Sequence, residues 1–175
     1  MGFFSRVFGR NTADTDPTRD WPPATGASPQ MNVERRALDS FGGPVALGDR
    51  IDAARVLGRP DSVEVLGAWT ILRYDRWGLV LEFEERQLFS VEFLVRECET
   101  GSAGLVDAVE PLGPDQTRLT RQTTEAELIE RFGPPDGEHD YRATGHLLYT
   151  RPPMVLSYVL DDEKRLVAWK VLANI

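Results

Sequence analysis

The sequence predicts an α+β protein built from two tandem copies of one unit, a short helical segment packed on an antiparallel sheet of three to four strands. Three observations lead to this fold class. A Gly-x-Pro-Asp motif that ends a predicted helix occurs twice, 75 residues apart. Three segments with alternating apolar and polar residues follow each motif. In both sets one side of the alternation is large and apolar, which is typical of a sheet with one buried face.

Residues 1–30 are expected to be a disordered leader and linker. Pro, Thr, Asp and Gly dominate residues 11–30, where Trp21 is the only large apolar side chain. Such a segment buries too little surface to offset the entropy of ordering it. Residues 1–10 place Phe and Arg side chains on different sides of a helical turn, which leaves a weak and peripheral membrane contact open.

An internal repeat organises the folded part of the chain. Leu57–Asp61 (LGRPD) matches Phe132–Asp136 (FGPPD), and the match continues at the same spacing through the next predicted strand. A three-residue insertion at Asp161–Glu163 then shifts the alignment. Agreement over most of the unit with a single gap favours duplication of one ancestral unit. The two copies are assigned to residues 31–104 and 105–175.

Each copy is expected to begin with a helix. Thr124 and Glu127 have the spacing of a capping box, and Gly133 followed by two prolines ends the second helix. The first helix is expected to be capped by Asp49 and to end at Gly58. Helices of this length need a sheet to pack against. The predicted strands cover residues 68–74, 78–84 and 88–95 in the first copy, and 144–150, 153–160 and 165–172 in the second. The segments 31–46 and 105–120 are each expected to add a helix or an edge strand.

Alternation separates two faces of each predicted sheet. One face is large and apolar in both copies, so we expect it to pack against the helices. Its members are Leu72, Tyr74, Leu79, Leu81, Phe83, Phe89, Val91 and Phe93 in the first copy, and Leu147, Tyr149, Met154, Leu156, Tyr158, Val167, Trp169 and Val171 in the second. The opposite face differs between the copies, which indicates a conserved scaffold with a changed outer surface.

A short helix ending in Leu/Phe-Gly-x-Pro-Asp, then a strand ending in Leu-x-Tyr and two more strands, resembles the repeat of the β-lactamase inhibitory protein fold. The small outer-membrane assembly lipoproteins (SmpA/OmlA-like) have a similar single unit. The resemblance covers residues 47–97 and 122–175. It implies a duplicated unit whose open sheet faces are free to hold a protein. This sequence has no lipobox, disulfide framework or secretion signal, so neither the compartment nor any inhibitory residue carries over.

Several classes of function are excluded by composition. The net charge of −8 argues against a nucleic-acid partner. The sequence contains no run of 18 apolar residues, the length that a membrane-spanning helix needs. The single Cys98 gives no disulfide framework, and we expect a cytoplasmic protein. His139 and His146 lack the spacing of metal ligands, and no Gly-rich phosphate loop is present. We therefore expect no cofactor, no metal and no small-molecule ligand, and we expect that the protein is not an enzyme.

The sequence therefore predicts a non-catalytic protein-binding module that grips a protein partner with its open sheet faces. Trp69 and Trp77 are the expected aromatic anchors, because aromatic and arginine side chains dominate most interfaces. The full set of candidate partner-binding residues is Trp69, Arg73, Trp77, Glu82, Glu92, His146 and Lys170. An immunity or inhibitor-type protein fits a small acidic domain of this kind.

Two alternatives stay open. One is a small-ligand-binding or hydrolytic domain with a pocket between the two repeats, lined by Tyr74, Tyr149 and His146. The other is a peripheral membrane adaptor that uses the Phe/Arg turn in residues 1–10.

Overall fold

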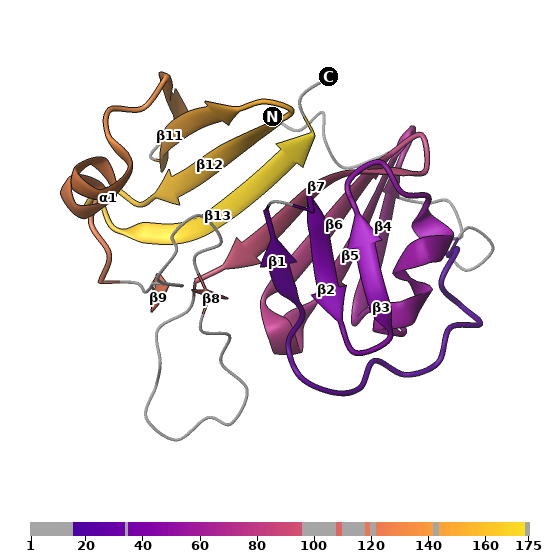
Figure 1. Ribbon diagram of the computed structural model, residues 1–175. Coiled ribbons are helices and arrows are strands. Elements are labelled where there is room, and N and C mark those ends of the chain that lie inside the picture. The colour runs from indigo at the N-terminus through magenta and orange to yellow at the C-terminus, as the bar shows by residue number, and fades with distance from the viewer. Residues whose placement is uncertain are drawn as a thin grey trace, which may run out of the picture.

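The computed structural model describes residues 16–33, 35–95, 108–109, 118–119, 122–141 and 144–173 (Figure 1). The expectations for residues 1–10 and for Cys98 fall outside these ranges. Of the segment 1–30, expected to be a disordered leader and linker, residues 16–30 are instead packed on the first half, with Trp21 buried in the core and the Pro22 carbonyl accepting a hydrogen bond from the Arg59 amide. The elements in chain order are β1 (Gln30–Asn32), β2 (Ala37–Ser40), β3 (Gly43–Ala46), η2 (Ile51–Leu57), β4 (Ser62–Leu66), β5 (Trp69–Tyr74), η3 (Asp75–Trp77), β6 (Leu79–Glu84), β7 (Gln87–Leu94), β8 (Ala108–Val109), β9 (Arg118–Leu119), α1 (Glu125–Phe132), β10 (Gly137–Tyr141), β11 (Thr144–Arg151), β12 (Met154–Leu160) and β13 (Leu166–Ala173). Among the described residues, no helix has the length and apolar character that crossing a membrane requires.

The predicted α+β class is wrong, because the described chain is mostly β and its helical segments do not repeat. The first predicted helix is instead the short 3₁₀ helix η2, which begins after Arg50 without a side-chain cap. Asp49, the expected cap, accepts a hydrogen bond from the Ala46 amide at 2.8 Å and so closes the preceding turn. The second helix, α1, forms with the predicted capping box between Thr124 and Glu127.

One antiparallel sheet of eight strands runs through both halves of the chain, which confirms the predicted antiparallel pairing. Its strand order is β10-β11-β12-β13-β7-β6-β5-β4. The last strands of the two halves, β7 and β13, pair with each other, and Trp169 lies opposite Phe93. The two predicted sheets are therefore one continuous sheet whose joint lies at its centre.

A different layer covers each half of this sheet on its core side. Residues 31–46, left open as helix or edge strand, contribute to a separate three-stranded sheet, β1-β2-β3, which lies with η2 in front of β4–β7 (Figure 1). In the second half α1 packs through Leu128, Ile129 and Phe132. Of residues 105–120, the described part forms only the short pair β8–β9. Buried apolar side chains from both halves nevertheless form one core.

The repeated motif makes the same tyrosine contact in both halves. The Tyr74 hydroxyl donates a hydrogen bond to the Gly58 carbonyl at 3.0 Å, and Tyr149 donates to the Gly133 carbonyl at 3.2 Å. The two glycines have nearly identical backbone angles, φ 82° and 81°, in a region that favours glycine. The tyrosine of each Leu-x-Tyr therefore ties the end of its strand to the end of the preceding helical segment.

The motif aspartates also have matching roles. A side-chain oxygen of Asp61 accepts a hydrogen bond from the Asp75 amide at 2.7 Å, and Asp136 accepts one from the Thr150 amide at 2.6 Å. The structure thus explains the motif, since it fixes the turn that leads into each half of the sheet. Duplication of the unit stays a prediction. Matching contacts in the two halves are expected if both halves descend from one ancestral unit.

Two predicted core residues, Phe89 and Val167, lie outside the core. One extra residue in β7 shifts its register against β6, and β13 is shifted in the same way against β12. Such a bulge changes which side chains face the core. Leu88 and Leu166 take the buried positions, while Phe89 and Val167 are half-buried.

Tyr74 gives a testable pH dependence. Burial raises the pKa of its hydroxyl, and the Asp61 carboxylate raises it further above the ordinary value of 10.0. The unfolded chain therefore loses this proton first, so the free energy of unfolding is expected to fall as the pH rises above about 10. Tyr74→Phe is expected to weaken that fall and to cost about 1 kcal/mol near neutral pH through the lost hydrogen bond. Urea unfolding of both proteins across this range measures it, and identical pH profiles would contradict the assignment.

Candidate protein-binding face

Six of the seven predicted binding residues lie on one face of the eight-stranded sheet. Arg73, Glu92 and Lys170 stand in one row of paired positions that crosses β5, β6, β7 and β13. Paired residues point to the same side of a sheet, as do alternate residues along a strand. The side chains of Trp69, Glu82 and His146 therefore share this side.

We call this side the open face. None of its residues belongs to the main core cluster, although Val80, Ser90, Ser157 and Ala168 at its centre are buried. Its described members include Ser62, Glu64, Leu66, Trp69, Ile71, Arg73, Val80, Glu82, Glu84, Gln87, Phe89, Ser90, Glu92, Leu94, His146, Leu148, Thr150, Val155, Ser157, Val159, Ala168, Lys170 and Leu172.

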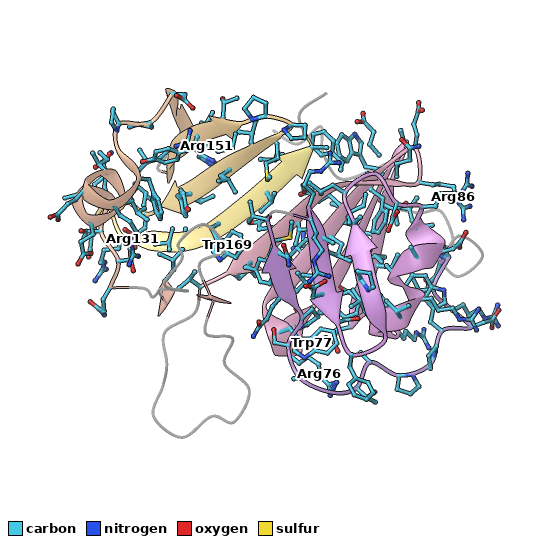
Figure 2. The ribbon with its side chains drawn as sticks, in the orientation of Figure 1. Arg76, Trp77, Arg86, Arg131, Arg151 and Trp169 are labelled. Carbon is cyan, nitrogen blue, oxygen red and sulfur yellow. The ribbon has the colours of Figure 1, made fainter. Side chains whose placement is uncertain are left out.

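Trp77 is the exception among the predicted residues, because it is buried in the core and only 5% exposed. It lies in η3, and its ring stacks on that of Tyr74 with centroids 5.3 Å apart. Arg76 covers its outer side at 5.5 Å, at the base of the first half (Figure 2). Trp77 therefore closes the end of the core and is not available as an exposed anchor.

A charged cluster occupies the centre of the open face, where the two halves join. The Lys170 ammonium lies 2.9 Å from Oε2 of Glu82 and 3.4 Å from Oε2 of Glu92. Ser90 donates a hydrogen bond to the same Glu82 oxygen at 2.5 Å. These charged side chains are only 20–22% exposed, so the cluster is partly shielded from water. Because the ammonium serves two carboxylates, the cluster keeps one negative charge and ties β6, β7 and β13 together.

The second half of the open face is mainly aliphatic. His146 is half-buried on β11, and its Nδ1 lies 3.2 Å from the Ser157 hydroxyl. The surrounding half-buried apolar side chains are Leu148, Val155, Val159 and Leu172. Among the described positions of this half, Lys170 at the joint is the only charged open-face residue. The arrangement therefore offers a low-polarity surface beside the central cluster.

The first half of the open face combines charge with aromatic side chains. Arg73 forms an ion pair with Glu64 at 3.9 Å, and both side chains are well exposed. The rings of Trp69 and Phe89 meet edge to face, with centroids 5.3 Å apart. Leu66 lies opposite Trp69 in the register and is 45% exposed.

Sequence reasoning missed several members of this first half. The alternation pattern placed Phe89 in the core because it cannot reveal the extra residue in β7. Leu66 and Glu64 were missed because β4 lies just before the first predicted strand. The alternating valines Val63 and Val65 in the segment Ser62–Leu66 were the available signal for an edge strand.

Comparison with known proteins assigns no family. No family model and no curated protein match the chain. Solved structures that are similar to it include the following three. A DUF4309 family protein (YjgB) from Bacillus subtilis has 12% identity and a TM-score of 0.46, with 70% of this chain and 76% of that chain covered. A cysteine-rich secretory protein (SAV1118) from Staphylococcus aureus has 11% identity and a TM-score of 0.48, with 90% and 48% covered. An extracellular protein containing an SCP domain from Bacillus anthracis has 9% identity and a TM-score of 0.48, with 86% and 48% covered. The chain therefore spans about half the length of the last two proteins.

Proposed function

We propose that this chain is a non-catalytic module that holds a protein partner on its open face, as an inhibitor or immunity-type protein of the cytoplasm. One observation carries the proposal. Six residues chosen from the sequence as binding residues share one continuous sheet face, and that face lies opposite the core. Half-buried aromatic and aliphatic side chains lie on both sides of a central charged cluster there, and aromatic side chains and arginine are enriched in protein interfaces.

The resemblance to the β-lactamase inhibitory protein fold gives a second line of support. The matching contacts of Tyr74 and Tyr149 are consistent with the duplicated unit on which that resemblance rests. The net charge of −8 favours a protein partner over a nucleic acid.

The proposal is tested by capture of partners from a lysate on the immobilised chain. The open-face variant is Trp69→Ala with Arg73→Ala, and the matched control is Arg55→Ala with Val56→Ala on η2. Arg55 and Val56 are exposed, and they lie in the layer on the other side of the sheet. The wild type and the control are expected to recover the same proteins, and the open-face variant is expected to lose them by about tenfold or more. Equal recovery by all three proteins would contradict the proposal.

A further inference from the structure

We propose that one corner of the open face, formed by Leu66, Trp69, Glu84 and Phe89, binds the guanidinium group of an arginine on the partner. We call these four residues the aromatic corner. The proposal rests on the proposed function, because it names the chemistry that the same face recognises.

The four side chains are brought together by strand register. Leu66 on β4 lies opposite Trp69 on β5, and Trp69 lies opposite Glu84 on β6. The extra residue in β7 turns Phe89 to the same side, where its ring meets the Trp69 ring at 89°. Trp69, Glu84 and Phe89 are each half-buried, so the corner is accessible yet partly shielded from water.

Glu84 is the open-face carboxylate for which the described residues provide no cation. Glu64 is paired with Arg73 at 3.9 Å. Glu82 and Glu92 share Lys170, as described above. For Glu84 no ion pair is found among the described residues, although it is half-buried. Within the part of the chain that the structure describes, a half-buried carboxylate beside two aromatic rings therefore has no compensating cation.

The nearest cation along the chain does not serve Glu84. Arg86 follows it in the β6–β7 turn, and its guanidinium nitrogen lies 3.6 Å from a side-chain oxygen of Asp52. Asp52 belongs to η2, on the other side of the sheet, so this ion pair draws Arg86 away from the open face. Glu85, the other residue of the turn, is exposed and adds a second negative charge near the corner.

This combination fits a guanidinium better than other cations. A guanidinium is planar and weakly hydrated, so it packs on aromatic rings while it donates two hydrogen bonds to one carboxylate. Its attraction to the face of a tryptophan adds to that of the carboxylate. A lysine ammonium is more strongly hydrated and gains less from the rings. The acidic net charge of the chain favours the approach of a basic partner.

The test is a titration with short peptides, followed by NMR through the indole N–H signal of Trp69. The probes are three acetylated tripeptide amides, made of arginine, lysine or citrulline, where citrulline keeps the shape of arginine without its charge. The triarginine peptide is expected to shift the Trp69 signal in a saturable manner. The lysine peptide is expected to bind about threefold more weakly, and the citrulline peptide is expected to show no saturable shift.

Variants assign the binding to the corner. Glu84→Gln and Trp69→Leu are each expected to weaken triarginine binding about three- to fivefold. Because Trp69→Leu removes the indole reporter, its titration is followed through the backbone amide signals of residues 84–89. Asp162→Asn is the matched control, because it removes one carboxylate at an exposed site in the β12–β13 turn, and it is expected to leave the affinity unchanged. Glu84→Gln conserves the shape of the side chain, so we expect this variant to fold. A dispersed amide spectrum of the variant verifies that its fold is intact.

The outcomes separate this inference from the proposed function. Equal binding of the lysine or citrulline peptide, or no effect of Glu84→Gln, would overturn the arginine site. If Glu84→Gln has no effect while the Trp69/Arg73 variant still loses its partner, the face binds a partner but the arginine site is wrong. If the corner binds triarginine while that variant recovers the same proteins as the wild type, the site stands and the proposed function fails.

Discussion

Gly58→Ala is expected to destabilise the protein much more than Gly133→Ala, although the two glycines have the same backbone conformation. Their φ and ψ angles are 82° and −176° at Gly58, and 81° and −175° at Gly133. This region is essentially restricted to glycine, so either alanine costs about 1–3 kcal/mol through backbone strain. The atoms around the two glycines differ. A Cβ at Gly58 would lie 2.5 Å from Cα of Ala24 and 2.7 Å from the Pro23 carbonyl oxygen, whereas a Cβ at Gly133 meets nothing within 4 Å.

The extra cost at Gly58 comes from moving backbone. The segment that contacts it is tied down by the Arg59 amide, which donates a hydrogen bond to the Pro22 carbonyl at 2.6 Å. An added methyl group must push this segment away, and overpacking of this kind costs about 1–3 kcal/mol more. Urea unfolding of both variants measures the difference. Equal losses of unfolding free energy in the two variants would show that residues 22–24 move aside without cost. Backbone strain alone would then account for the loss at both positions.

Local signals were enough to predict some elements of this fold. The capping box between Thr124 and Glu127 predicted α1 because its hydrogen bonds join residues only three positions apart. Alternation predicted the central strands and the side on which Trp69 and Lys170 lie, since side-chain direction in a strand depends only on neighbouring residues. The same alternation places Trp69, Glu82 and Lys170 on one side of the sheet without any information about contacts between the halves.

Features that depend on distant contacts were not predictable in this way. Asp49 is suited to cap a helix, yet it caps the turn at Ala46 because β3 and η2 meet there. The strands β1–β3 are three or four residues long, and β3 contains Pro44, so neither length nor composition marks them as a sheet. The pairing of β7 with β13 joins the two halves, and alternation carries no information about which strands become neighbours. Glu84 escaped notice as a site residue because its lack of a cation depends on Arg86 turning toward η2.

Trp169→Ala is expected to lower the free energy of unfolding by about 3–5 kcal/mol, the usual cost of removing a buried tryptophan. Trp169 is 1% exposed and lies where β13 meets β7 (Figure 2). Its ring stacks on Phe93 with centroids 4.6 Å apart and planes 13° from parallel. One residue thus packs against both halves of the sheet, and its loss leaves a cavity at the joint.

Trp169→Phe separates packing from hydrogen bonding at this joint. Within the described part of the chain the buried indole N–H of Trp169 has no hydrogen-bond partner. The phenylalanine variant therefore loses ring volume but no hydrogen bond, and we expect it to cost about 1–2 kcal/mol, well below the alanine variant. Urea unfolding followed by far-ultraviolet circular dichroism compares the two variants. If phenylalanine costs as much as alanine, the indole N–H must be bonded in solution. If alanine costs less than about 1 kcal/mol, the two halves are not held together by packing at Trp169 and Phe93, and the joint must depend on the backbone pairing of β7 with β13 and on the ion pairs of Lys170.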